Sequence, residues 1–210
     1  DFLREMEFNK LLSRAIGFYG EIGDKKNKSV NPQIKSDIVN VKDYESITDE
    51  KILDKWIKIL SEQSVIAVDT ETSSLNPLDA DLVGISFSYA PNKACYIPLA
   101  HKNIKGLKKE VVLKKIKPIL EDPSIKKVGQ NIKFDFIILN QNNIKITSLE
   151  DTMLISYTLD AGTNRHNLDT LSEIHLNHKT ISYKELVGTG KNKLNFSDIA
   201  LDKATEYAAE

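Results

Sequence analysis

The chain has 210 residues, a formal net charge of −1 and 28% charged residues, which suits one substantial globular domain or one domain with an appendage. The near-zero charge argues against extensive binding to duplex nucleic acid, which usually needs a basic patch, but it leaves open a site for a few nucleotides. The single Cys95 excludes an internal disulfide, and no apolar run approaches the ~20 residues of a membrane span. We therefore expect a cytoplasmic, monomeric protein without a membrane partner.

The first 36 residues are expected to form an appendage. Apolar residues recur at helical spacing over residues 1–19, which predicts an amphipathic helix. Residues 20–36 are polar and contain Pro32, so we interpret them as a linker. The chain starts without an initiator Met or a signal-peptide pattern, so we interpret it as part of a longer polypeptide. Residues 1–36 would then belong to a segment that follows another domain, and residues 37–210 would form the main domain.

The main domain is predicted to be an α/β domain with a mixed sheet. Asp49 is expected to cap a helix over residues 50–63. The alternating and periodic apolar patterns that follow predict strands at 65–69, 82–90, 94–99 and 126–129, and helices at 108–120, 132–141, 151–160, 168–176 and 198–210. Early strands joined by tight turns, then helices alternating with a short strand, are typical of a mixed β-sheet flanked by α-helices.

Two carboxylates stand where the apolar run Val65-Ile66-Ala67 ends. Asp69 and Glu71 are two residues apart, and alternate residues of a strand point to the same face. Burying two like charges side by side is unfavourable unless a cation joins them, and carboxylate oxygens are the ligands that Mg²⁺ prefers. The pair therefore predicts a metal site if further acids join it.

A second candidate group lies between residues 129 and 135. A strand is expected to end at Gly129, and Asn131 could cap the following helix. Asp135 lies four residues later, so both would fall on one helix face. A carboxylate in a first helical turn is favoured by the helix dipole in any case, so a structural role for Asp135 is as open as a shared metal with Asp69.

The chain ends in Tyr207-Ala208-Ala209-Glu210, at the end of the last predicted helix. Two alanines permit close packing against another element. Tyr207 could orient a water molecule, or it could be a core aromatic residue with its hydroxyl at the rim.

Taken together, the D-T-E-T of residues 69–72, the N-x-x-x-D of 131–135 and the final Tyr-Ala-Ala-Glu resemble the three exonuclease motifs of family A bacterial DNA polymerases. The resemblance covers roughly residues 40–210 and is greatest to the proofreading domain of the DNA polymerase I type. It implies a ribonuclease H-like fold and a 3′–5′ exonuclease that acts in DNA replication and repair. It also implies that the single-stranded 3′ end of DNA is the substrate and that a polymerase domain of the same polypeptide is the partner.

The resemblance implies a role for each matching residue. Asp69 would bridge two Mg²⁺ or Mn²⁺ ions, Glu71 would help to hold the first ion, and Asp135 would serve the second. Tyr207, with Glu71, would orient the attacking water. The residues that would handle the terminal nucleotides are Thr70, Leu75, Gln130, Asn131, Phe134 and Arg165.

One departure and two rival functions remain open. The third family motif is Tyr-x-x-x-Asp, and its Asp would be the residue after Glu210, so we expect the chain as given to bind metal weakly and cleave slowly. A catalytically inactive scaffold domain is one alternative, although Asp69, Glu71 and Asp135 are all retained. A ribonuclease D-type RNA exonuclease, which shares the motifs, is the other.

Other polar residues are expected to have structural roles. His175 and His178 lack a further ligand at metal-binding spacing, so structural or surface roles are expected. Asp151 is expected to cap the helix that begins at Thr152.

Overall fold

The computed structural model describes residues 2–20, 44–190 and 193–210, and the chain divides into two compact units, Asp1–Ile34 and Lys35–Glu210. In the first unit, α1 (Phe2–Glu5) and α2 (Asn9–Tyr19) bury no residue. The prediction of a single helix over residues 1–19 is wrong. The chain turns between the two helices, where Glu7 has a left-handed φ of 54°. Most of the expected linker, residues 21–36, lies outside the described residues.

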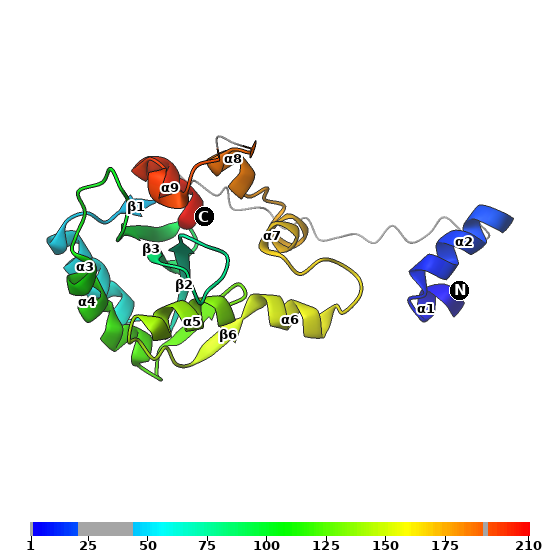
Figure 1. The fold of residues 1–210 in the computed structure, drawn as a ribbon. Coiled ribbons are helices and arrows are strands. Elements are labelled where there is room, and N and C mark those ends of the chain that lie inside the picture. The colour runs from blue at the N-terminus through cyan, green and yellow to red at the C-terminus, as the bar shows by residue number, and fades with distance from the viewer. Residues whose placement is uncertain (1, 21–43, 191–192) are drawn as a thin grey trace. The chain divides into compact units, whose positions relative to one another are not determined.

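The second unit is built on a six-stranded mixed sheet (Figure 1). Its strands are β1 (Glu45–Ser46), β2 (Val65–Thr72), β3 (Leu82–Ala90), β4 (Lys93–Pro98), β5 (Lys126–Gly129) and β6 (Leu149–Asp151), in the order β1-β4-β3-β2-β5-β6. The pairs β2–β3 and β3–β4 are antiparallel, whereas β1–β4, β2–β5 and β5–β6 are parallel. The predicted mixed sheet is confirmed.

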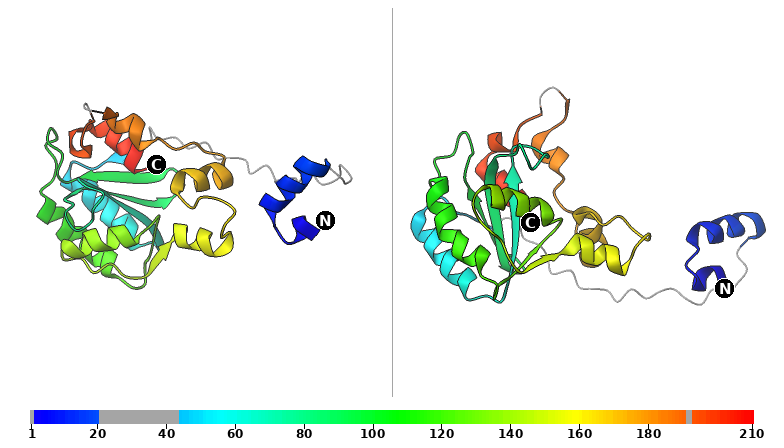
Figure 2. Two further views of the ribbon diagram at one scale, coloured as in Figure 1. Left: turned by 45° about the vertical axis from the view of Figure 1, so that its right-hand side comes forward. Right: turned by 60° about the horizontal axis from the view of Figure 1, so that its bottom comes forward.

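Helices cover the two faces of the sheet unequally (Figure 2). α3 (Glu50–Ser61), α4 (Lys109–Glu121) and α5 (Lys133–Gln141) lie on one face, and α9 (Leu201–Ala208) lies on the other beside the short α8 (Tyr183–Val187). α6 (Thr152–Leu159) and α7 (Leu168–Leu176) follow β6. Asp49 caps α3 as predicted, since its carboxylate accepts hydrogen bonds from the backbone N–H groups of Lys51 and Ile52. Among the described residues, no helix is long and apolar enough to cross a membrane.

The alternation of the strands divides the buried apolar residues into two cores. The larger core, under α3 and α4, takes Ile66 and Val68 from β2 and Ile85 and Phe87 from β3. The smaller core, under α8 and α9, takes Val83 from β3 and Tyr96 from β4, and packs them against Val187, Phe196 and Ala204. β2 contributes to the larger core only. Val65, Ala67 and Asp69, on its other face, are exposed, so this part of the sheet is left without a helical cover.

Candidate active site

The uncovered face of β2 forms the floor of a cavity of about 390 Å³. Ala67, Asp69 and Glu71 lie on this face of β2, and their cross-strand partners on β3 are Ser88, Ser86 and Gly84. Because these partners have small side chains or none, the floor is hollow around the two acids. The end of α9, from Tyr207 to Glu210, and the segment before α8, including Thr180 and Ile181, form the walls.

A glycine opposite Glu71 makes room for a buried aromatic ring. A Cβ atom on Gly84 would lie 1.9 Å from the hydroxyl oxygen of Tyr96 and 2.3 Å from its Cζ atom, so no larger residue fits there without moving the ring. The Tyr96 hydroxyl lies 2.8 Å from Nε2 of His101. Burial, and then the charge of Glu71, raise the pKa of Tyr96, so the phenol stays neutral beside the acid.

Asp135 reaches the same region from the first turn of α5. Its side chain is 2% exposed, and its Oδ1 atom accepts hydrogen bonds from the backbone N–H of Thr70 at 2.9 Å and from the Thr70 hydroxyl at 2.6 Å. Thr70 stands between the two cavity acids and points to the opposite face of β2. It therefore connects the acids of β2 to the acid of α5.

Burial disfavours the ionised form of all three acids, and the charge of Asp135 adds to this effect at Asp69 and Glu71. Burial, and then the charge of Asp135, raise the pKa of Asp69 to about 8, although its side chain meets solvent through the cavity. Burial, followed by the charges of Asp69 and Asp135, raises the pKa of Glu71. Burial raises the pKa of Asp135 to about 6, against the opposing effect of its hydrogen bonds from Thr70. A cation between these groups would relieve their repulsion.

The donor atoms suit a hard divalent cation, since all three side chains offer carboxylate oxygens. Within residues 2–20, 44–190 and 193–210, however, no three His, Cys, Asp or Glu side chains gather closely enough to hold an ion as they stand. An ion would therefore need a rearrangement of these side chains or a further oxygen ligand.

Tyr207 lines the same cavity as Asp69 and Glu71. Its ring packs at 6.0 Å from the rings of both Tyr183 and Phe196. Burial, and then the charges of Glu71 and Asp69, raise the pKa of Tyr207, so its hydroxyl keeps the proton and can donate it in a hydrogen bond.

The expected role of Asn131 as a helix cap is wrong. α5 begins at Lys133, and Asn131 precedes it in the left-handed conformation with a φ of 56°. Its backbone N–H donates to Oδ1 of Asp151, and its side chain makes no capping hydrogen bond. Asn131 and Asp135 therefore do not share a helix face. The predicted capping role of Asp151 is confirmed, because the same Oδ1 atom also accepts from the N–H groups of Met153 and Leu154.

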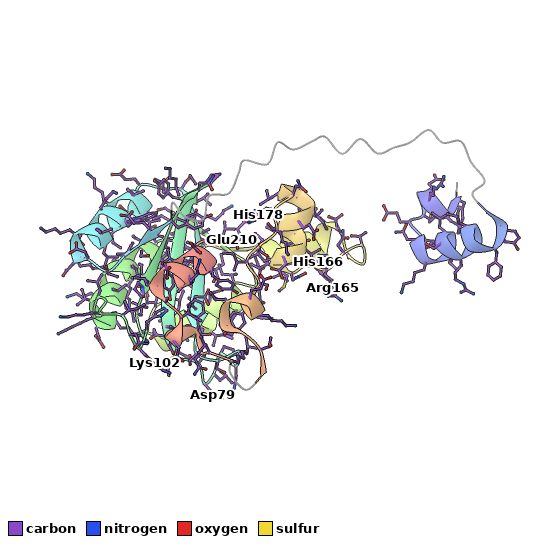
Figure 3. The ribbon with its side chains drawn as sticks, turned by 90° about the horizontal axis from the view of Figure 1, so that it is seen from above. Asp79, Lys102, Arg165, His166, His178 and Glu210 are labelled. Atoms are coloured by element: carbon purple, nitrogen blue, oxygen red, sulfur yellow. The ribbon has the colours of Figure 1, made fainter. Side chains whose placement is uncertain are left out.

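Of the remaining predicted substrate residues, only some lie at the cavity. Gln130 lines it and is held by the His166 carbonyl and the Thr152 hydroxyl. Phe134 is half-buried on α5. Leu75 is 91% exposed in the loop after β2, and Arg165 is exposed on the loop between α6 and α7 (Figure 3). None of these last three side chains lines the cavity that holds Asp69 and Glu71.

Sequence reasoning missed a buried polar contact at the cavity wall. Glu210, whose side chain is 7% exposed, places Oε1 2.7 Å from Nε2 of His178, and its Oε2 atom accepts from the backbone N–H of Ile181 at 2.7 Å (Figure 3). This contact joins the end of α9 to the segment that follows α7. The acid at the end of Tyr-Ala-Ala-Glu was the only sequence signal for it.

Known proteins resemble this chain over most of its length. A family model described as 3′–5′ exonuclease matches residues 44–210. DNA polymerase I of Rhizobium leguminosarum is 41% identical over 80% of this chain and 18% of that protein, and the Pseudomonas aeruginosa enzyme is 37% identical over 99% of this chain and 23% of that protein. The chain thus spans less than a quarter of either relative.

Among solved structures, Escherichia coli RNase D, an exoribonuclease involved in structured RNA processing, matches with a TM-score of 0.58 and 20% identity. The match covers 79% of this chain and 40% of that one, and at this identity it supports the fold alone. The fold is therefore the ribonuclease H-like arrangement expected from the sequence.

Proposed function

Because this chain belongs to the 3′–5′ exonuclease family of DNA polymerase I, we propose that residues 37–210 remove nucleotides from the 3′ end of single-stranded or frayed DNA with the help of two divalent cations. The observation that carries the proposal is the group of acids at the cavity. Asp69 and Glu71 share one uncovered strand face, Asp135 is connected to them through Thr70, and the pKa of each carboxyl group is raised.

The proposed ligands of Mg²⁺ or Mn²⁺ are Asp69, Glu71 and Asp135. When bound, two such ions can supply an activated water and offset the charge on both the entering and the leaving oxygen of a phosphodiester. Replacing the mutual repulsion of the three carboxylates by attraction to the cations would stabilise their ionised forms.

Tyr207 is proposed to position the attacking water together with Glu71. The two residues line one cavity, and the raised pKa of the Tyr207 hydroxyl keeps it a hydrogen-bond donor. Its packing against Tyr183 and Phe196 fixes the ring, so the hydroxyl can orient a water without a large loss of side-chain entropy.

The proposed contacts with the terminal nucleotides come from three segments: the loop after β2, α5 and the loop between α6 and α7. Leu75 and Phe134 offer apolar surface for unpaired bases, and the exposed guanidinium of Arg165 offers a fork-shaped donor for a phosphate. Gln130 and Asn131 stand where β5 ends. Thr70 is proposed to act mainly through its backbone and its hydrogen bond to Asp135, because its side chain already donates there.

The test is a cleavage assay with a 5′-labelled single-stranded DNA oligonucleotide and Mn²⁺. It compares the chain, a version extended by an aspartate after Glu210, and the extended Asp69→Ala variant. We expect a ladder of products shortened at the 3′ end from the wild-type proteins, stronger with the extension, and none from Asp69→Ala. A folded, extended wild-type protein that leaves the oligonucleotide intact would favour the scaffold function instead.

An RNA oligonucleotide of the same sequence distinguishes the second alternative. Because the fold is similar to that of RNase D, an RNA substrate is also possible in principle. RNA differs from DNA by its 2′-hydroxyl group, so a site that selects one of them must recognise or reject this group. We expect DNA to be shortened faster than RNA. The proposed partner is a polymerase domain in the same cytoplasmic polypeptide, since both polymerase relatives extend far beyond the matched region.

A further inference from the structure

The position of Tyr207 depends on the last turn of a short helix. α9 has eight residues, and Tyr207 is the last but one of them. The ends of helices fray, because their terminal groups lack partners within the helix. A hydroxyl that orients a water molecule must nevertheless be held to within about 0.5 Å. The end of α9 therefore needs contacts with the rest of the unit.

Glu210 supplies such a contact just after the helix ends. Its Oε1 atom lies 2.7 Å from Nε2 of His178, and its Oε2 atom accepts from the backbone N–H of Ile181 at 2.7 Å (Figure 3). We call these two hydrogen bonds the Glu210 anchor. The two residues between Tyr207 and Glu210 are alanines, so Glu210 is the first residue after Tyr207 whose side chain can form a hydrogen bond.

The segment that receives the anchor is itself fixed to α7. The Ser172 hydroxyl donates to the His178 carbonyl at 3.0 Å, and the Thr180 hydroxyl donates to Oδ1 of Asp169 at 2.7 Å. Ser172 is buried, and Asp169 lies in the first turn of α7. Glu210 therefore attaches the end of α9 to a segment that α7 already holds in place.

The same segment leads into α8, whose first residue packs against Tyr207. The ring of Tyr183 lies 6.0 Å from the ring of Tyr207. Tyr207 is thus held through its ring by α8, and through the chain that follows it by the Glu210 anchor. Loss of the anchor would free the helix end and move the Tyr207 hydroxyl relative to Glu71, which lines the same cavity.

Glu210 also lines the cavity that holds Asp69 and Glu71, but both of its carboxylate oxygens already have hydrogen-bond partners. Its side chain is 7% exposed. Turning this carboxylate towards a cation would leave the donors at His178 and Ile181 without their acceptor, which is unfavourable. The contacts thus give Glu210 a different role from that of the proposed metal ligands.

We propose that Glu210 is a positioning residue for the exonuclease reaction. Through His178 and the Ile181 N–H it fixes the end of α9, and it thereby places the Tyr207 hydroxyl in the cavity. This inference rests on the proposed exonuclease function. Because Glu210 acts through Tyr207, its loss slows cleavage and leaves the affinity for the cation unchanged. A contact that only stabilised the fold would not show this dependence on Tyr207.

Two measurements test the proposal, and one of them does not need activity. The first is single-turnover cleavage of a 5′-labelled single-stranded DNA oligonucleotide by the chain extended by an aspartate, together with the Mn²⁺ affinity from calorimetry. The second is ¹⁹F NMR of the chain as it stands, with 3-fluorotyrosine at position 207. The fluorine signal reports the surroundings and the order of that ring.

The variants are Glu210→Ala and Glu210→Gln, each with and without Tyr207→Phe, and His178→Ala. Ser46→Ala is the matched control. Ser46 forms a hydrogen bond of 2.7 Å with the Thr205 hydroxyl, so this variant also removes a contact of α9, but neither residue lines the cavity. His178, whose side chain is 24% exposed, tests the same contact if Glu210→Ala does not fold.

We expect Glu210→Ala to slow single-turnover cleavage about tenfold and to change the Mn²⁺ affinity by less than about twofold. Glu210→Gln keeps an acceptor for the Ile181 N–H and can pair with the other tautomer of His178, so it should recover most of the rate. In the Tyr207→Phe background, Glu210→Ala should cause no further loss. The fluorine signal should shift or broaden in Glu210→Ala and His178→Ala and stay unchanged in Ser46→Ala.

A further loss of the same size in the Tyr207→Phe background would overturn the proposal, and so would equal slowing by Ser46→Ala, because either result indicates a general loss of stability. A large loss of Mn²⁺ affinity in Glu210→Ala would identify Glu210 as a ligand instead. If the extended wild-type protein folds but does not cleave, the exonuclease function fails. The fluorine signal still decides in that case, since an unchanged signal in Glu210→Ala shows that the anchor does not position Tyr207.

Discussion

Binding of a divalent cation to the metal-free protein should release at least about one proton per molecule at pH 7. A carboxyl group with a pKa of about 8, such as that of Asp69, is roughly nine-tenths protonated at this pH, and one with a pKa of about 6, such as that of Asp135, roughly one-tenth. Ligating carboxylates must be ionised, so these protons leave when the cation binds. Glu71, whose pKa is also raised, would add to this number.

Isothermal titration calorimetry with Mn²⁺ in buffers of different ionisation enthalpy measures the number of protons released. Between pH 7 and pH 9 the contribution of Asp69 should fall from roughly nine-tenths of a proton to roughly one-tenth, while the affinity for Mn²⁺ rises. Asp69→Asn should remove this contribution and weaken binding. Release near zero at pH 7, or release that does not change with pH in the wild-type protein, would refute the assignment of Asp69 as a protonated ligand.

The same groups fix the sign of the pH dependence of stability. Because the folded-state pKa values of Asp69 and Asp135 lie above their unfolded values near 4, the metal-free folded protein binds these protons more tightly than the unfolded chain does. Their contribution to stability is full below about pH 4 and is lost as the pH rises through about 6 and about 8. The melting temperature of the metal-free protein should therefore fall from pH 5 to pH 9, and saturating Mn²⁺ should counteract the fall.

Three substitutions test the geometry around the acids. Gly84→Ala should lower the free energy of unfolding by about 1–3 kcal/mol, because the added methyl group displaces the buried ring of Tyr96. Thr70→Val should lower it by about 1–3 kcal/mol, because the buried carboxylate of Asp135 loses a hydrogen bond of 2.6 Å. Tyr207→Phe should slow cleavage and leave Mn²⁺ affinity unchanged. Chemical denaturation gives the first two values, and single-turnover cleavage with calorimetry gives the third.

Each of these substitutions has its own control. Thr70→Ser restores the hydroxyl donor, so it should recover most of the stability lost in Thr70→Val. Ser86→Ala, on the cavity floor two residues along β3 from Gly84, adds no atom and should not disturb Tyr96. A stability change below about 0.5 kcal/mol for Gly84→Ala would contradict the packing described here, and a large loss of Mn²⁺ affinity in Tyr207→Phe would show that Tyr207 has a different role.

The sequence predicted the long elements of the fold because their periodicity is carried by many residues. The eight-residue β2 and the twelve-residue α3 were anticipated, whereas the two-residue β1 and the five-residue α8 are too short to show a period. Asn131 was taken for a helix cap because Asn suits that position, but the same side chain also tolerates the left-handed conformation that it adopts here. Propensity alone could not distinguish these two uses.

In the candidate site, too, contacts between residues close in sequence could be predicted, whereas contacts between distant residues could not. Asp69 and Glu71 could be paired from the sequence, because strand geometry places residues two apart on one face. The hydrogen bonds from Thr70 to Asp135 and between His178 and Glu210 join residues 65 and 32 positions apart. Contacts at such separations depend on the tertiary fold, which a local pattern does not contain. The family resemblance placed Asp135 beside Asp69, but it did not indicate that Thr70 connects them.

The two faces of β2 have different roles, and this difference determines where the site lies. Ile66 and Val68 anchor the strand in the larger core, so the opposite face can carry like charges without removing apolar burial from the fold. The small partners of that face on β3 leave space above the acids, and Gly84 lets Tyr96 close the space beside Glu71. The charges of Asp69 and Glu71 therefore lie on a face that contributes little to the core, whereas Asp135 meets Thr70 on the opposite face of β2. A cation can relieve the repulsion among these charges without any change in the packing that holds the strand.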